Sequence, residues 1–195
     1  SGGLSGADML LASYIFAFRI YADFSGYSDM ARGIGKAMGF DIVVNFKVPF
    51  FSVNISDFWQ RWHISLTTWI KEYLFYPLAL ARVFGKQLSS GLVIIITWAI
   101  MGFWHGPAWK FVLWGIYHGV IIALYSKLRP YFRMIKPKNI LASKALIAAQ
   151  VIFIFNLFCL GILFFAMDSA SQVFAAWRAI FFNFAVSKLY NFDFA

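Results

Sequence analysis

The amino-acid sequence predicts an all-α membrane protein that crosses the bilayer several times. We expect short, broken and re-entrant helices together with one amphipathic helix at the membrane interface. Of the 195 residues, 62% are apolar and only 13% are charged, whereas soluble domains are about 45–50% apolar and about 25% charged. A chain of this size cannot bury so much apolar surface in one core, so lipid must cover the rest.

Charge and cysteine content narrow the class of protein. The net charge of +9 in so apolar a chain suits anionic lipid headgroups and cytoplasmic loops. The basic residues do not cluster on a soluble module, so we expect no nucleic-acid partner. The single cysteine, Cys159, excludes an internal disulfide and a cysteine-based metal cluster. We expect one membrane domain over residues 1–195, as part of a longer protein.

The first expected element is a membrane segment over Met9–Tyr21, which is short for a span. The polar stretch "ADFSGYSDMA" (22–31) then interrupts the apolar run, and we expect it to line an internal chamber. A short, glycine-interrupted helix is predicted over residues 30–41. Residues 42–51 are predicted to be extended or looping, because Pro49 disfavours helix at the residue before it.

An amphipathic helix is predicted over Ser56–Tyr73. At roughly 100° per residue, its aromatic side chains fall within an arc of about 120° and most of its charges fall opposite. Ser56 is the expected N-cap, with Asp57 in the first turn. We expect this helix to lie in the membrane interface; a helix half-buried against protein is the alternative. His63 falls at the edge of the apolar arc.

Residues 91–126 are apolar on both sides of His105-Gly106-Pro107. As one helix this segment would be roughly 54 Å long, against a hydrocarbon core of about 30 Å. The flanking regions 29–90 and 127–144 carry seven and six Lys/Arg, so both favour the cytoplasm. The sequence therefore predicts a hairpin or re-entrant pair bent at His105, with His105 at membrane depth.

The C-terminal part contains the clearest spanning helix. Between Lys144 and Asp168 the chain carries no charge for more than twenty residues, which is long enough to cross the bilayer. The tail over residues 169–192 is either an amphipathic interfacial helix or the start of another span.

Three histidines are candidate functional residues. An ionisable side chain at membrane depth is costly and indicates function. The neutral form of a histidine such as His105 can be held within the membrane at a tolerable cost in free energy. The ordinary pKa of histidine is close enough to neutrality for it to act as a general base. The alternative is a packing histidine that is hydrogen-bonded to a nearby carbonyl. His63 could orient substrate or share the proton transfer. His118 is expected to form a hydrogen bond between helices. Their spacing matches no metal motif.

Two non-enzymatic classes stay open at this point. A membrane haem protein would use His105 and His118, since helical histidines ligate haem, although Pro107 breaks the helix between them. A transport or scaffold subunit would pass a lipid-linked group without chemistry. Asp23, which ends the first apolar segment, could hold a histidine's second nitrogen or bond Ser25 and Tyr27 in a turn.

Three ordered blocks carry a family resemblance that covers about Tyr14 to Met167. "DFSGYSDMARGIGKAMGF", "NFKVPFFSVNISDFWQRWHISLTTWIKEYLFYPL" and "MGFWHGPAWKFVLWGIYHG" resemble the membrane-bound O-acyltransferase family. They are most similar to its bacterial branch that O-acetylates polysaccharides such as alginate. The branch that transfers D-alanyl groups to teichoic acid is a more distant relative.

The resemblance implies that the complete protein is a multi-pass enzyme of the inner membrane. It also implies that this chain is the C-terminal portion of a larger acyltransferase fold. Such an enzyme moves an acyl group, acetyl in the first instance, from a cytoplasmic thioester such as acetyl-CoA. The group passes through a central funnel to polysaccharide hydroxyls in the periplasm or outside the cell, with a periplasmic or extracellular acetyl-transfer partner. D-alanyl transfer to an envelope polymer is the alternative. No permanently bound cofactor or metal is implied.

The resemblance also implies roles for individual residues. His105 matches the invariant histidine, which deprotonates the attacking hydroxyl or a partner's nucleophile, and His63 matches a second motif histidine that assists from the cytoplasmic side. We expect substrate contacts from Asp23, Trp104, Trp62 and Arg61.

The chain departs from the family pattern in two ways. We expect helices outside this chain to complete the chamber, because relatives are longer. An arginine that relatives carry in a "Phe-Phe-Arg" element is replaced here by "FFAMDSA".

Overall fold

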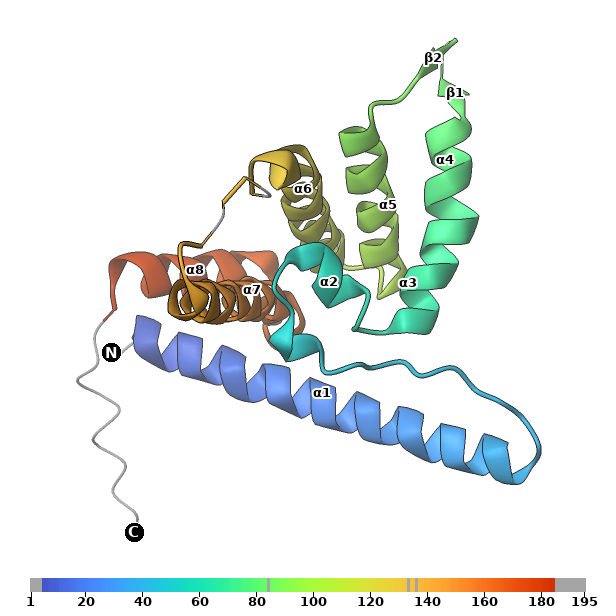
Figure 1. The fold of residues 1–195 in the computed structure, drawn as a ribbon, viewed down its shortest axis with the longest axis horizontal. Helices are drawn as coiled ribbons and strands as arrows, with labels where there is room; N and C mark the ends of the chain where they lie inside the picture. Colours follow the sequence, from blue (N-terminus) through green and yellow to red (C-terminus); the bar gives the residue numbers. More distant parts are fainter. Residues whose placement is uncertain (1–4, 84, 133, 136, 185–195) are drawn as a thin grey trace.

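The computed structural model describes residues 5–83, 85–132, 134–135 and 137–184 (Figure 1). The all-α class is confirmed, because the strands found among these residues form only one antiparallel hairpin in which Arg82 pairs with Gln87. The elements in chain order are α1 (Gly6–Ala37), η1 (Pro49–Phe51), α2 (Ile55–Trp59), α3 (Ile64–Ile70), η2 (Lys71–Phe75), α4 (Tyr76–Leu80), β1 (Arg82–Val83), β2 (Lys86–Gln87), α5 (Ser90–Trp104), α6 (Trp109–Phe132), α7 (Ile140–Ala166) and α8 (Ala170–Phe182).

Two helices, α6 and α7, are long and apolar enough to cross a membrane. Their 24 and 27 residues give lengths of about 36 and 40 Å, against a hydrocarbon core of about 30 Å. The predicted spanning helix is thus present, but it begins at Ile140 rather than Lys144. The Asn139 side chain caps the helix by accepting a hydrogen bond from Ala142 N–H (2.8 Å). This N-cap explains why the helix begins before Lys144, where the charge pattern places its start.

Helix α1 runs without interruption for 32 residues, through the polar stretch 22–31 (Figure 1). The prediction that this stretch separates two helices is therefore wrong. Its charged side chains lie on an exposed face of the helix and pair along it, as Asp23 does with Arg19 (3.7 Å) and Asp29 with Arg32 (3.3 Å). Pairs three or four residues apart are compatible with continuous helix. The helix ends only near Gly39, which has φ 85°, where a residue without Cβ favours termination.

The region predicted as one helix over 56–73 is broken. The loop expected over 42–51 is present but longer, since residues 38–54 are irregular apart from the short η1. Helix α2 begins at Ile55 because Asn54, not Ser56, is the N-cap; its side chain accepts from Asp57 N–H (2.9 Å). After a turn that ends at His63, α3, η2 and α4 continue as one rod. Backbone hydrogen bonds from the 45–47 loop to this turn replace those of a continuous helix.

The predicted hairpin is confirmed, because α5 and α6 lie side by side and the chain reverses after His105 (Figure 1). Glycines allow the close approach. A Cβ on Gly115 would overlap the Trp98 carbonyl, and a Cβ on Gly102 would overlap the Phe111 carbonyl. Small residues at such positions let two membrane helices pack backbone to backbone. The 15 residues of α5 reach only about 22 Å.

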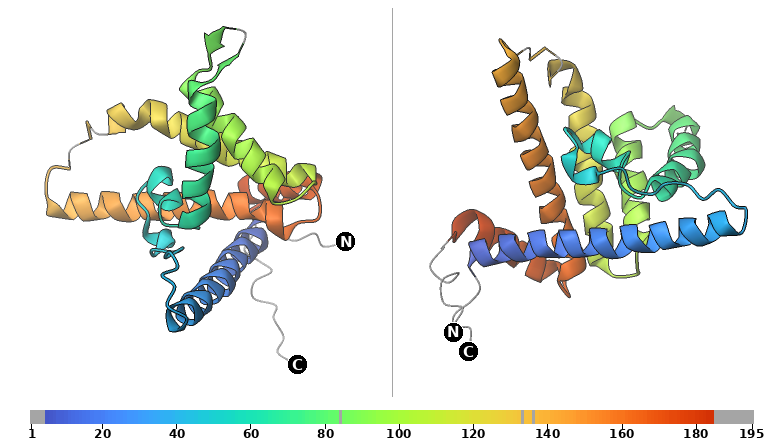
Figure 2. Two further views of the ribbon diagram at one scale, coloured as in Figure 1. Left: turned by 90° about the vertical axis from the view of Figure 1, so that its right-hand side faces the viewer. Right: turned by 60° about the horizontal axis from the view of Figure 1, so that its bottom comes forward.

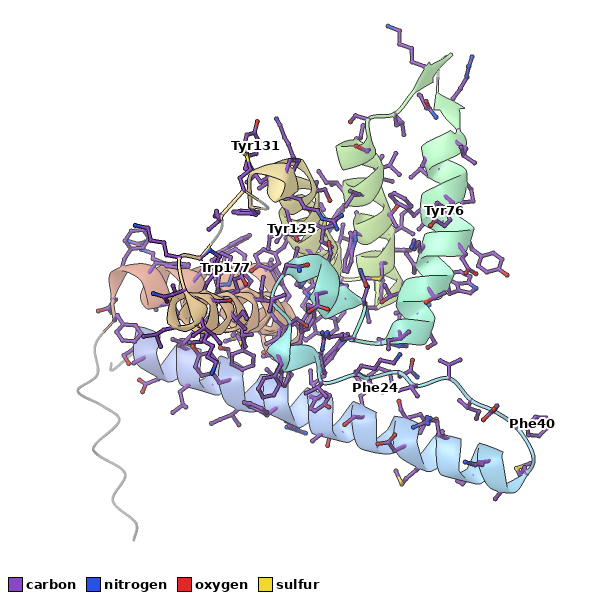
Figure 3. All side chains as sticks on the ribbon, in the orientation of Figure 1. Phe24, Phe40, Tyr76, Tyr125, Tyr131 and Trp177 are labelled. Carbon is purple, nitrogen blue, oxygen red and sulfur yellow. The ribbon has the colours of Figure 1, made fainter. Side chains whose placement is uncertain are left out.

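Helices α1, α7 and α8 form a second group that packs against the hairpin (Figure 2). The tail predicted over 169–192 is helical in α8, whose capping box joins Ser169 and Gln172; residues 185–192 of that prediction lie outside the described residues. Trp177, labelled in Figure 3, fixes α8 to α7 by donating its indole N–H to the Leu160 carbonyl (3.1 Å).

The glycine contacts predict how the hairpin responds to an added methyl group. Gly115→Ala should lower the free energy of unfolding by roughly 1–3 kcal/mol, because a well-packed interface must shift to admit it. Thermal unfolding in detergent, followed by tryptophan fluorescence, measures the change.

Gly26→Ala is the matched control. A Cβ at Gly26, in α1, meets nothing within 4 Å, and alanine favours helix over glycine by about 1 kcal/mol. Equal unfolding temperatures for the two variants would contradict the packing described for α5 and α6.

Candidate active site

One small cavity brings two of the three histidines together. It has a volume of about 100 Å³, and both His63 and His105 line it although they are far apart in the sequence. The remaining walls are almost entirely apolar and come from α1, the 59–67 segment, α5, α6 and α7. The aromatic members of the wall are Phe24, Trp59, Trp62, Trp114, Phe158 and Phe165.

His105 stands at the C-terminal end of α5, where its N–H still bonds the Gly102 carbonyl (3.0 Å). Gly106 follows, and a Cβ there would lie 2.7 Å from the Phe111 ring. The imidazole packs edge-on against Trp114 and Phe165, with ring centroids 5.1 and 5.2 Å away.

No other described residue hydrogen-bonds to the His105 imidazole. The carbonyl-bonded packing histidine considered as an alternative is therefore not what these residues form. Both ring nitrogens are left to exchange a proton with a ligand.

His63 has a left-handed backbone conformation, with φ 45° and ψ 57°. This conformation is uncommon for a residue with a side chain and is found often at functional sites. The half-buried imidazole contacts the Phe24 ring edge-on at 4.7 Å, and its Nδ1 is buried without a hydrogen-bond partner among the described residues. The turn thus places at the cavity wall an imidazole whose Nδ1 has no hydrogen-bond partner among the described residues.

Burial lowers the pKa of His63 below its ordinary value of 6.5, because removal from water disfavours the charged imidazolium. His63 is consequently neutral at pH 7 and able to accept a proton. Since His105 lines the same cavity, a positive charge on one imidazole disfavours a second charge on the other. The cavity therefore suits the transfer of a single proton.

The four expected substrate contacts lie at different places. Trp62 is buried and lines the cavity. Trp104 contacts the His105 ring (4.9 Å) but is 59% exposed and lies outside the cavity wall. Arg61 pairs with Asp57 (2.7 Å), and neither residue lines the cavity. Asp23 is an exposed helical residue that pairs with Arg19 rather than with a histidine.

Several residues of the cavity wall are not predicted from the sequence, and Trp59 and Trp114 are the most informative of them. Their indole N–H groups are buried and have no acceptor among the described residues. Buried donors are nearly always satisfied, so unpaired ones beside a cavity indicate a polar ligand or water. The presence of Trp59 only four residues before His63 is a sequence signal, but the reversal after Pro107 is needed to bring Trp114 to the same place.

His118 lies outside the cavity and is fully buried. Trp114 separates it from His105, with its ring 5.0 Å from one and 5.1 Å from the other. The expected interhelical hydrogen bond is not found, because neither nitrogen of His118 has a partner among the described residues. His118 packs instead against Gly161, where a Cβ would lie 2.7 Å from Nε2. The two histidines form no facing pair for haem.

A larger groove of about 480 Å³ shares Trp59, Thr67 and Met101 with the cavity. It runs between the α2–η2 segment and the α5–α6 hairpin, and Lys71 and Arg129 lie along it. Thr97 also lines it, and its hydroxyl is buried without a partner among the described residues. The groove therefore combines basic side chains, a polar group and an apolar floor.

The fold is helical and of membrane type, and two imidazoles line one aromatic cavity. These features define a membrane protein with a candidate acid–base site. The family profile described as "MBOAT, membrane-bound O-acyltransferase family" matches residues 6–170. The chain belongs to the membrane-bound O-acyltransferase family, as the resemblance had predicted.

Three curated relatives illustrate the similarity. The peptidoglycan O-acetyltransferase of Helicobacter pylori is 42% identical over 131 residues, 66% of this chain and 24% of the relative. The "Probable alginate O-acetylase" of Azotobacter vinelandii is 42% identical over 122 residues, 63% of this chain and 24% of the relative. The teichoic acid D-alanyltransferase of Bacillus subtilis is 29% identical over 162 residues, 80% of this chain and 40% of the relative. The chain thus spans less than half the length of these relatives.

The lowered pKa of His63 predicts a pH dependence of stability. Unfolding lets His63 bind a proton more readily, so its contribution to stability is present above the unfolded pKa of about 6.5 and declines as the pH falls below it. Acidification from about pH 7.5 to 5.5 should lower the unfolding temperature of the native protein more than that of a His63→Gln variant. Identical shifts for the two proteins would contradict the buried, neutral state of His63.

Proposed function

We propose that this chain forms the catalytic part of an acyltransferase in the inner membrane, with several membrane crossings. The enzyme moves an acyl group, acetyl in the first instance, from a cytoplasmic thioester to hydroxyls of an envelope polysaccharide. The observation that carries the proposal is the cavity at which His63 and His105 meet, in a chain that belongs to a family of O-acyltransferases.

The reaction needs one base and a dry site. His105 accepts the proton of the attacking hydroxyl, which belongs to the polysaccharide or to the partner protein, while the hydroxyl oxygen forms a bond to the thioester carbonyl carbon. The carbon–sulfur bond then breaks, and the leaving thiolate takes up the proton that the imidazole holds. His63 orients the reactants beside His105. The aromatic wall keeps bulk water away, which limits hydrolysis of the thioester.

The indole N–H groups of Trp59 and Trp114 suit the developing negative charge. Each is a buried donor that lacks an acceptor among the described residues, and each belongs to a side chain that lines the cavity. Donors that are already in place when charge develops on a carbonyl oxygen stabilise it without reorganisation. This supports acyl transfer over passive passage of a group.

The groove next to the cavity is the donor's route in this proposal. Lys71 belongs to the basic region 29–90 and Arg129 to the basic region 127–144, and both regions favour the cytoplasmic side. Acetyl-CoA and other acyl thioester carriers bear phosphates, which basic side chains bind. Because the groove and cavity share Trp59, Thr67 and Met101, a phosphate held at the basic side chains leaves the thioester arm directed at the histidines.

The names of the relatives support a polysaccharide as the acceptor. Those with about 42% identity are named for O-acetylation of peptidoglycan and of alginate, so we propose a polysaccharide hydroxyl as acceptor. Membrane lipid surrounds the protein, and a periplasmic or extracellular partner completes the transfer. Similarity to teichoic acid D-alanyltransferases, which extends over 80% of the chain in Bacillus subtilis, favours D-alanyl transfer to an envelope polymer as the second candidate.

Replacing the proposed base tests the reaction. His105→Gln in the complete protein should lower envelope ester formation by about 100-fold or more, because loss of general-base catalysis typically costs a factor of about 10²–10⁴. The ester content of the envelope in cells that carry only the variant provides the measurement.

Lys86→Gln introduces the same side chain at an exposed position on the β1–β2 hairpin and should leave ester content unchanged. If His105→Gln cells retain full ester content, the protein is a transport or scaffold subunit instead. Equal membrane levels of the two variants must be verified by immunoblot.

The groove predicts a separate effect on donor binding. Lys71→Gln with Arg129→Gln should raise KM for the thioester donor about tenfold while kcat changes less than twofold, because uniform binding energy is lost without loss of the base. Steady-state kinetics of the purified protein with acetyl-CoA measure both constants. A fall in kcat with unchanged KM would contradict the assignment of the groove to the donor.

A further inference from the structure

We infer that Asn45 is a positioning residue. Its hydrogen bonds to the start of α3 stabilise the left-handed turn at His63, and this turn directs the imidazole towards the cavity. The inference rests on the proposed function for its effect on catalysis, but the placement of His63 can be tested without any activity. Asn45 belongs to the loop between α1 and η1, and it does not line the cavity.

Asn45 bonds both residues that follow His63. Its backbone carbonyl accepts a hydrogen bond from Ile64 N–H (3.0 Å). Its side-chain oxygen accepts from Ser65 N–H (3.1 Å) and also from Ser65 Oγ (2.6 Å). One asparagine, twenty residues away in sequence, thus fixes the first turn of α3.

These bonds do what an N-cap side chain normally does. The first amides of a helix lack partners within the helix, and the side chain of the N-cap residue usually supplies one. His63 occupies the N-cap position of α3 and makes no side-chain capping bond. Because Asn45 satisfies Ile64 and Ser65 instead, the imidazole of His63 need not fold back on the helix and remains available to the cavity.

Packing holds the loop that carries Asn45. The neighbouring Phe46 ring lies edge-on against the rings of Trp62 (5.1 Å) and Phe24 (5.1 Å), both of which line the cavity. One residue further, Lys47 N–H bonds the Arg61 carbonyl (3.0 Å). The loop is therefore anchored on both sides of the turn at His63, and Asn45 is placed to bond it.

Loss of the Asn45 side chain removes both hydrogen bonds from Ser65 and leaves only the backbone bond from Ile64 N–H to hold the strained turn. A left-handed conformation of a residue with a Cβ persists only when the surrounding structure imposes it. In Asn45→Ala the turn relaxes, and the side chain at position 63 spends more time in solvent. The carboxylate of Asn45→Asp still accepts both bonds from Ser65, so this variant keeps the turn.

A thiol at position 63 reports its own exposure. We compare His63→Cys alone with His63→Cys combined with Asn45→Ala, in the complete protein in detergent, using a small methanethiosulfonate reagent. The native Cys159 is buried; it is replaced by Ala, together with any other cysteine of the complete protein, in every protein compared, to remove background labelling. The labelling rate should rise about fivefold or more when Asn45 is lost, and remain low with Asn45→Asp, because exposure and access control thiol reactivity.

Activity of the native-histidine protein provides the second readout. Asn45→Ala should lower kcat about tenfold with less than twofold change in donor KM, because a misaligned group loses orientation rather than binding energy. Ser65→Ala, which removes one of the three bonds, should show a smaller loss in the same direction. It also serves as the readout if Asn45→Ala fails to fold.

Asn156→Ala is the matched control. Asn156 is also half-buried, accepts a hydrogen bond from the Tyr14 hydroxyl (2.6 Å) and lies in α7 outside the cavity wall. It should change neither the labelling rate at position 63 nor kcat.

The outcomes separate the two claims. Unchanged labelling at position 63 after loss of Asn45 overturns the positioning role, whatever the activity shows. If labelling is faster but the Asn45→Ala protein keeps full activity, the claim that Asn45 positions His63 for catalysis is also overturned. If His105→Gln retains full transfer while labelling still depends on Asn45, the proposed function fails and the structural clamp stands.

Discussion

Two interruptions of the helical backbone place both imidazoles at one small cavity, and the rest of the structure supports this arrangement. His105 follows the last residue of α5, just before the chain reverses at Gly106 and Pro107. His63 precedes α3 in a left-handed turn. A continuous helix at either position would send the imidazole along a helix face that packs against lipid or protein. The close α5–α6 contact at glycines and the clamp from the 45–47 loop keep both interruptions in place.

The polar groups of this region lie around an otherwise apolar cavity. Unpaired donors or acceptors occur on His63, Trp59 and Trp114 among the described residues, although buried polar groups are rarely left unsatisfied. Such groups are stabilised when a ligand supplies their partners. An acyl thioester and a hydroxyl acceptor offer a carbonyl oxygen and a proton, which match an indole donor and a neutral imidazole.

Much of the fold follows from local sequence patterns. Long apolar runs predict α7, and the Gly-Pro break within an apolar segment predicts the α5–α6 hairpin. The polar stretch 22–31 predicts a helix break that α1 does not contain. These side chains instead lie on an exposed face of α1 and pair along it. The break at His63 was missed because its cause, Asn45, is a long-range partner that helical periodicity cannot reveal.

In the candidate site too, local sequence predicts some residues, and long-range packing brings in the others. The sequence predicts both catalytic candidates, His63 and His105, and the structure brings them to one cavity. Trp62 adjoins His63 and reaches the wall, whereas Asp23 and Arg61, also expected to contact substrate, pair with neighbouring charges instead. Trp114 and Phe165 join the wall only through the packing of α6 and α7 against the turn, which no local signal indicates.

A structure of the complete protein with a non-reactive thioether analogue of acetyl-CoA tests the central claim most directly. Cryo-electron microscopy should show the acetyl group of the analogue in contact with His105 and within the wall formed by His63, Trp59 and Trp114. Density for that group at a site remote from both imidazoles, with the cavity closed by side chains, would contradict the account.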